Sequence, residues 1–72
     1  MLQPYQQRVL EEKAELEKRF VSLADFFHTE TFHELPEAER VRLHSQFRFM
    51  GGYLAMLNGR IEAFEEPPPS GI

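Results

Sequence analysis

Cysteine is absent from this chain, and its absence removes the commonest way of stabilising a short domain. A chain of 72 residues buries too small a fraction of its surface to be comfortably stable without added support. Disulfides are excluded, and no group of cysteines and histidines has the spacing of a structural zinc site. Self-association is the remaining route, so we expect a homo-oligomer. The lack of cysteine also fits a reducing compartment.

An excess of positive charge is also missing. The formal net charge of −4 argues against binding to DNA or RNA polymers, which a basic surface normally attracts. A local group of arginines could still bind a small anion. Long hydrophobic runs are missing as well, since the longest uncharged stretch has eleven residues and a membrane span needs about 20. We therefore expect a cytoplasmic protein with no membrane partner.

The sequence predicts an all-α fold, an antiparallel two-helix hairpin in a domain covering residues 1–65. Pro4 suits the first position of a helix over about 4–28, and Pro36 starts a second helix over about 36–65. Thr31 and Glu34 have capping-box spacing, which predicts a short helical turn in the connection. Because the connection is short, the helices must fold back on one another. The proline-rich tail 66–72 cannot continue a helix and is interpreted as disordered.

Both predicted helices have an apolar seam with alternating spacings of three and four residues. The seam of the second helix is unbroken, and consists of Leu43, Phe47, Met50, Leu54, Leu57, Ile61 and Phe64. The first helix contributes Leu2, Val9, Leu16, Phe20, Leu23 and Phe27, with polar residues at two seam positions. These two seams predict the core of the hairpin.

A second row on the second helix cannot be covered by the first helix. The stretch from Phe49 to Gly59 is uncharged on every side over about three turns, or roughly 16 Å. The second row comprises Phe49, Tyr53, Met56 and Arg60, beside a smooth strip of Gly51, Gly52, Ala55 and Gly59. Three helical glycines, each costing about 1 kcal/mol, indicate close approach of a backbone or ligand. We expect further copies of the chain to cover this surface, in a homo-oligomeric helical bundle.

Catalysis has little support in the sequence. The serines lack a triad context, and Gly51-Gly52 lies in a predicted helix instead of a phosphate-binding loop. The acidic residues of the first helix read as a solvated face: Glu11, Glu12, Glu15 and Glu17. The histidines, His28, His33 and His44, need not converge on a metal. We predict no catalytic residue, no metal site and no cofactor.

The remaining polar and aromatic residues suit a nucleotide ligand. Aromatic faces stack on bases, arginines bind phosphates and amides contact base edges. The candidate ligand-binding residues are Tyr5, Gln6, Arg8, Lys13, Arg48, Tyr53, Asn58 and Arg60. In an antiparallel hairpin, Tyr5 and Arg8 come near Asn58, Arg60 and Phe64. The alternative is ordinary surface charge with a core tyrosine, and for Tyr53, Asn58 and Arg60 also a hydrogen bond at an interface.

Three segments, PYQQRV.EEKAEL, LPEAER and M..Y...L..RI.AF, resemble small phage-encoded helical-hairpin proteins. That group is similar to the hairpin domain of the phage anti-CBASS and anti-Thoeris nucleotide sponges. The resemblance implies a helical homo-oligomer, often a hexamer, that sequesters cyclic nucleotide immune signals in pockets between protomers without cleaving them. It would place the protein in the host bacterial cytoplasm and assign it to immune evasion.

We therefore expect a sponge for cyclic di- or trinucleotides or molecules of the cyclic ADP-ribose type. Two alternatives remain. The negative charge favours an acidic inhibitor of a host defence protein, acting by protein–protein contact. The unbroken seam also fits a purely structural helical assembly protein.

Overall fold

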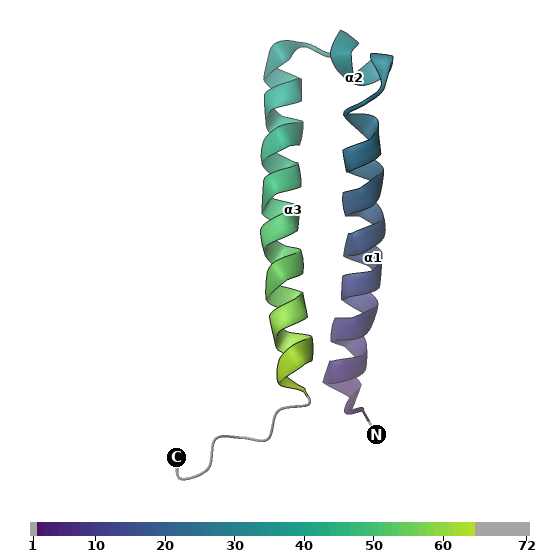
Figure 1. Ribbon diagram of the computed structural model, residues 1–72, viewed down its shortest axis with the longest axis vertical. Coiled ribbons are helices and arrows are strands. Elements are labelled where there is room, and N and C mark those ends of the chain that lie inside the picture. Colours follow the sequence, from purple (N-terminus) through teal and green to yellow (C-terminus); the bar gives the residue numbers. More distant parts are fainter. Residues whose placement is uncertain (1, 65–72) are drawn as a thin grey trace.

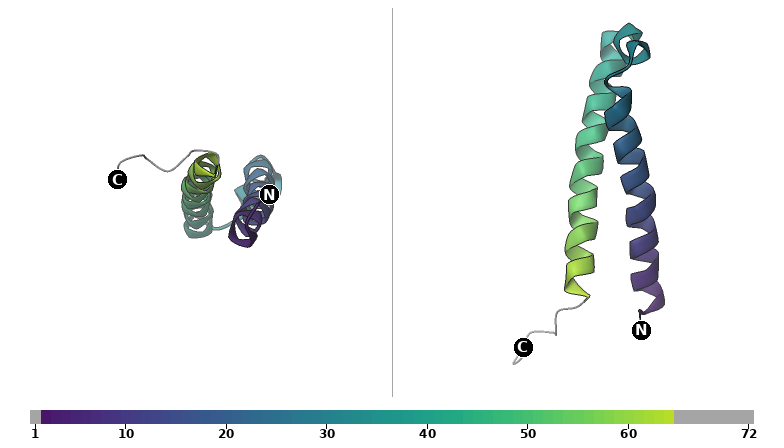
Figure 2. Two further views of the ribbon diagram at one scale, coloured as in Figure 1. Left: turned by 90° about the horizontal axis from the view of Figure 1, so that it is seen from below. Right: turned by 45° about the vertical axis from the view of Figure 1, so that its right-hand side comes forward.

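A computed structural model describes residues 2–64 of the chain, which form three helices. Helix α1 spans Pro4–Phe26, α2 spans Glu30–Glu34 and α3 spans Glu37–Ala63. Figure 1 shows α1 and α3 side by side and antiparallel, with α2 across one end. The views in Figure 2 show the same two-helix arrangement. The predicted all-α hairpin is confirmed, and the 66–72 tail prediction lies outside the described residues.

The helix boundaries differ from the predicted ones by small amounts. Helix α1 begins at Pro4 as predicted but ends at Phe26, and Phe27 caps it instead of a continuation to His28. The N–H of His28 donates to the carbonyl of Asp25 in the turn that follows. Helix α3 begins one residue after Pro36, whose carbonyl accepts from the N–H of Glu39.

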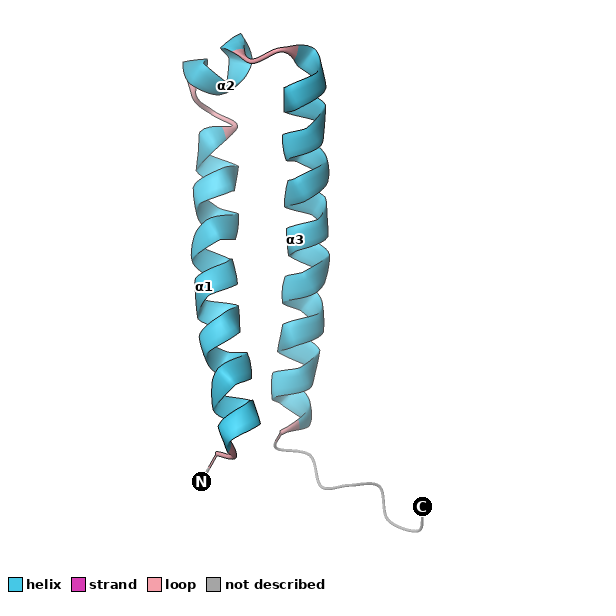
Figure 3. Cartoon of the chain, turned by 180° about the vertical axis from the view of Figure 1, so that it is seen from behind, coloured by secondary structure: helices cyan, strands magenta, loops and turns pink. Residues whose placement is uncertain are grey.

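The predicted helical turn in the connection is present, but Thr29 caps it, not Thr31. Thr29 has an extended backbone, and its Oγ1 accepts a hydrogen bond from the N–H of Phe32 at 3.2 Å. The same hydroxyl donates to the carbonyl of Phe26 at 2.7 Å. Thr29 therefore links the end of α1 to the start of α2. Figure 3 shows the two loops on either side of α2.

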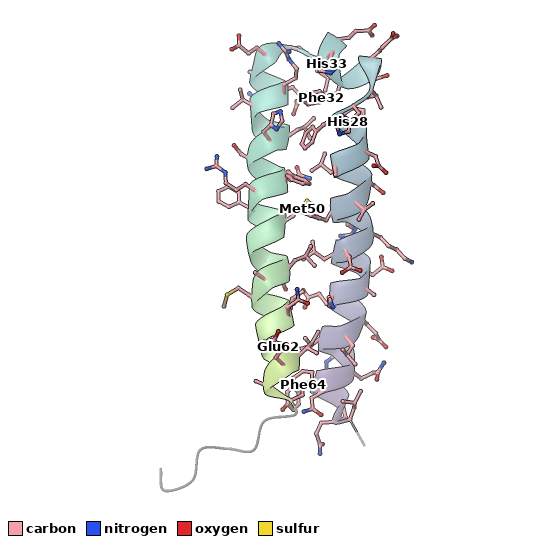
Figure 4. All side chains as sticks on the ribbon, viewed as in Figure 1. His28, Phe32, His33, Met50, Glu62 and Phe64 are labelled. Carbon is pink, nitrogen blue, oxygen red and sulfur yellow. The ribbon has the colours of Figure 1, made fainter. Side chains whose placement is uncertain are left out.

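The core lies along the seam between α1 and α3, as the spacing of apolar residues predicted. Val9, Phe32, Leu54 and Leu57 are buried, and Leu57 is completely so. Figure 4 shows Phe32, Met50 and Phe64 at successive levels along the hairpin. Leu2 is the seam residue that departs from the prediction, because it lies before α1 and is 46% exposed.

Aromatic rings fill the end of the hairpin that α2 closes. Phe20 of α1 stacks on Phe47 of α3, with ring centroids 4.3 Å apart and planes 9° from parallel. Phe27 stacks on His44 at 4.4 Å, and its edge meets Phe32 at 5.0 Å. Such pairs add to the apolar burial that closes this end. At the other end, where α1 begins and α3 finishes, no further helix lies across the hairpin within residues 2–64, and we call it the open end.

Candidate functional site

The open end brings together two aromatic residues that are far apart in the sequence. The edge of one ring of the Tyr5–Phe64 pair meets the face of the other, with centroids 6.0 Å apart and an interplanar angle of 89°. This contact confirms the expectation that the start of the first helix lies beside the end of the second. Tyr5 is still 50% exposed, so about half of its surface is available to another molecule.

Two turns further along α1, a polar contact also links the two long helices. The Tyr53 hydroxyl of α3 donates a hydrogen bond to Oε2 of Glu12 on α1. This bond to the Glu12 carboxylate raises the pKa of Tyr53, while the positive charge of Arg60 acts to lower it. Tyr53, Glu12 and Arg60 therefore form one electrostatic group on the surface of the hairpin.

Glu12 is the member of this group that sequence reasoning missed. We assigned it with the other glutamates to a solvated face, whereas it accepts a hydrogen bond across the two helices. A signal for it exists, because Glu12 lies two turns after Tyr5 and so shares its side of α1. The antiparallel pairing then brings that side next to Tyr53.

The eight candidate ligand-binding residues fall on different sides of the hairpin. At 100° per residue, four share the side of the Tyr53–Glu12 contact, and we call this the Tyr53 flank: Tyr5, Arg8, Tyr53 and Arg60, with Glu12. The same helical spacing puts Gln6, Lys13 and Asn58 on the opposite flank, and Arg48 further round α3. A single site containing all eight within one protomer is therefore excluded.

Gln6 also has a structural task. Its Oε1 accepts a hydrogen bond from the backbone N–H of Gln3 at 2.8 Å. This bond satisfies a donor that the first turn of a helix leaves without a partner. The side chain of Gln6 thus stabilises the start of α1.

The Tyr53 flank is a surface and not an enclosed cavity. Tyr53 is 44% exposed, and Arg8 and Arg60 are exposed as well. Small-molecule sites usually bury most of their ligand between walls. One hairpin supplies a single wall, so tight binding of a nucleotide here requires a second surface.

The outer face of α3 is apolar and uncovered. Phe49 is 75% exposed, Met56 66% and Val41 57%. A hollow of about 660 Å³ lies on this face, and every residue lining it belongs to α3, between Val41 and Tyr53. The prediction that α1 cannot cover this second row is confirmed. Gly51 is different, because a Cβ there would lie 3.3 Å from the Phe20 ring, so this glycine faces α1 instead of the smooth outer strip.

The histidines lie at the closed end, away from the Tyr53 flank. His44 stacks on Phe27, and the edge of His33 meets Phe32 at 5.4 Å. Among residues 2–64, no three side chains of the His, Cys, Asp and Glu types come together as a metal site would need. No helix in the same range has the length and apolar composition to cross a membrane.

A family model described as Sequestin matches residues 3–63. No curated protein and no solved structure matches the chain. The family name fits the sequestering proteins that the sequence resembles. Because the matched segment contains α1, α2 and α3 in full, this chain belongs to the Sequestin family.

Proposed function

We propose that this protein is a phage anti-defence sponge, which binds cyclic nucleotide immune signals and holds them away from their effector without cleaving them. The family name, Sequestin, supports sequestration. The chemistry of the Tyr53 flank supports a nucleotide as the ligand. The proposed place of action is the host bacterial cytoplasm, and the ligand belongs to the cyclic di- or trinucleotides or the cyclic ADP-ribose type.

The observation that carries the proposal is the grouping of aromatic and basic side chains on the Tyr53 flank. Tyr5 and Tyr53 are exposed rings that can stack on bases, each worth about 1–3 kcal/mol. Arg8 and Arg60 offer planar guanidinium groups for bidentate contact with phosphate. The hydrogen bond to Glu12 fixes the Tyr53 ring at its hydroxyl end and leaves the ring face for stacking.

Glu12 also limits where the anionic part of a ligand can lie. Its carboxylate repels phosphate, so a phosphate group would approach Arg60 from the side away from Glu12. The base would then lie towards Tyr53. This arrangement orients the ligand without a reactive group, as sequestration requires.

We further propose that the pockets form between protomers of a homo-oligomer. The exposure of the Tyr53 flank supports this, because a second protomer would add the missing wall. A preformed pocket between rigid helices binds with little loss of conformational entropy. The resemblance to nucleotide sponges favours a hexamer.

The proposal is tested by isothermal titration calorimetry of the purified protein with cyclic dinucleotides, cyclic trinucleotides and cyclic ADP-ribose isomers. We expect saturable binding of at least one class, and recovery of the intact nucleotide after heat denaturation of the protein. A chemically altered nucleotide would contradict sequestration. The absence of binding to every class would overturn the nucleotide proposal.

A pair of charge variants tests the assignment to the Tyr53 flank. Arg60→Ala should raise the dissociation constant for the nucleotide at least about tenfold, since it removes a charge-assisted contact. Lys18→Ala is the matched control, because Lys18 is exposed on α1 and pairs with Glu15 at 3.9 Å. Equal weakening by both variants would indicate a general charge effect and would contradict the assignment.

A further inference from the structure

Small and large uncharged residues alternate along the outer face of α3. Their spacings are four and three residues, which keeps them on the side of the helix away from α1. We call this row the outer stripe: Ser45, Phe49, Gly52, Met56 and Gly59 alternate in size, and Ala63 ends the row. The large members are two turns apart, and a glycine follows each of them after three residues.

The hairpin itself gives no reason for Gly52 and Gly59. A Cβ built at either position would meet no described atom within 4 Å. Each glycine costs about 1 kcal/mol relative to alanine inside a helix. Phe49 and Met56 are 75% and 66% exposed, so the hairpin leaves most of their apolar surface in contact with water, which is unfavourable. Both features become favourable when a second helix lies close against this stripe.

We propose that a second copy of this chain packs its α3 antiparallel against the outer stripe, with a two-fold axis at the level of Leu54. In this register Phe49 lies over the partner's Gly59, and Met56 lies over the partner's Gly52. Every large side chain of the stripe meets a glycine, and the two-fold axis repeats each contact. The stripe is thus complementary to itself, which is the requirement for a symmetric dimer.

The position of the uncharged stretch selects the same register. The uncharged stretch Phe49–Gly59 is centred on Leu54, so the antiparallel copies cover each other's uncharged surface over its full length. Arg48, just before that stretch, and the partner's Arg60, just after it, then lie at the same level at the rim of the contact, outside the covered stretch. A parallel pair would instead set Phe49 against the partner's Phe49 and Met56 against the partner's Met56. Displacing the antiparallel register by one heptad would bring Arg42 over the partner's Gly59 and bury a charge.

The pairing also extends the Tyr53 flank. Tyr53 lies at the edge of the outer stripe, so the two-fold axis brings the Tyr53 side chains of both copies to the same side of the dimer. One Arg60 then lies on each side of this tyrosine pair. A ligand with two anionic groups related by two-fold symmetry fits this arrangement, and this last step rests on the proposed function. The interface itself does not depend on any ligand.

Single engineered cysteines test the geometry cleanly, because the chain has none of its own. Ala55 and the partner's Ala55 lie within a turn of each other, beside the axis, in the proposed register. Ala55→Cys should therefore be linked efficiently by a short bismaleimide in the ligand-free protein. Ser45→Cys should not, because nine residues from the axis on each side separate the two copies by about 27 Å. Efficient linking of Ser45→Cys would indicate parallel pairing and would overturn the proposal.

A charge placed in the stripe tests the interface energetically. Phe49→Glu should raise the dissociation constant of the proposed dimer at least about tenfold, since Phe49 packs on the partner's Gly59 within the proposed contact. Ala14→Glu adds the same charge at an exposed position of α1 and should leave the constant unchanged. Circular dichroism verifies that both variants keep the helical hairpin. A light-scattering mass of one protomer, 8.5 kDa, for the unmodified chain at micromolar concentration would overturn the proposal. Dimerisation without nucleotide binding would leave the interface supported and the proposed function refuted.

Discussion

Glu12 of α1 accepts a hydrogen bond from the hydroxyl of Tyr53 on α3, and this contact joins the two long helices on the flank that also carries Arg60. The two residues are 41 positions apart in the sequence. Their pairing turns an acidic residue of a charged helix into part of the candidate binding surface. It also makes the ionisation of Tyr53 a direct probe of the hairpin.

Replacing Glu12 should lower the pKa of Tyr53. The hydrogen bond to Glu12 holds that pKa above the ordinary tyrosine value of 10.0, so Glu12→Gln should move it back towards this value. Absorbance titration of the phenolate measures the change, in a Tyr5→Phe background that leaves Tyr53 as the remaining tyrosine. An unchanged titration would contradict the hydrogen bond in solution.

The same shift predicts how stability depends on pH. Because the folded state raises the pKa of Tyr53, the unfolded chain ionises first as the pH increases. The stabilisation is complete below pH 10 and is lost as the pH rises through the folded-state pKa. Urea unfolding at a series of alkaline pH values should show this loss in the native protein. Tyr53→Phe should lack this contribution.

Truncation of Leu57 should destabilise the hairpin strongly. Leu57 is fully buried between α1 and α3, so Leu57→Ala removes apolar contacts and leaves a cavity. The expected loss of unfolding free energy is about 2–5 kcal/mol. Val41→Ala is the matched control, because Val41 is 57% exposed in the hairpin. Urea unfolding at one fixed protein concentration compares the two, and equal losses would contradict the assigned core.

Removal of the Thr29 cap should cost more than removal of Thr31. Thr29 Oγ1 accepts from the N–H of Phe32 and donates to the carbonyl of Phe26, so Thr29→Ala loses both bonds. We expect a loss of about 1 kcal/mol. Thr31 is exposed within α2, and Thr31→Ala should change the unfolding free energy by less than about 0.5 kcal/mol. The reverse order would favour the capping box predicted from the sequence.

The glycines of α3 should respond differently to alanine. In a Phe49→Glu background, which removes the proposed self-pairing, Gly52→Ala should raise the unfolding free energy by about 1 kcal/mol through helix propensity. Gly51→Ala should gain less, because its Cβ would lie 3.3 Å from the ring of Phe20 and require that ring to move. Thermal unfolding by circular dichroism measures both. An equal gain would contradict the close contact between Gly51 and Phe20.

The fold could be predicted because its signals are local and periodic. Pro4 and Pro36 mark the two helix starts, and the alternating spacing that includes Leu54 and Leu57 marks the buried side of α3. The cap of α2 could not be chosen in the same way. Threonine is a residue type that favours helix N-caps, so Thr29 and Thr31 are both candidates. Only the extended backbone at Thr29 decides between them.

The candidate site was predicted less completely, because it depends on which side of α1 lies next to which side of α3. Residue types alone selected Tyr5, Arg8, Tyr53 and Arg60, but the same criterion also selected Gln6, Lys13 and Asn58 on the opposite flank. It passed over Glu12, since an isolated glutamate on a charged helix has no signal of its own. A hydrogen bond between residues of different helices depends on the rotation and level of both.

The amino-acid sequence by itself determined that this member of the Sequestin family forms two long helices that pack along an apolar seam. It also determined that the uncharged stretch of the second helix extends beyond the side that packs on the first. Those features follow from side-chain periodicity, which each helix expresses independently of its partner. The tertiary structure alone decided that Glu12 meets Tyr53 and that Gly51 faces Phe20. Each of these depends on how α1 and α3 are rotated against each other, and packing along the whole interface sets that rotation.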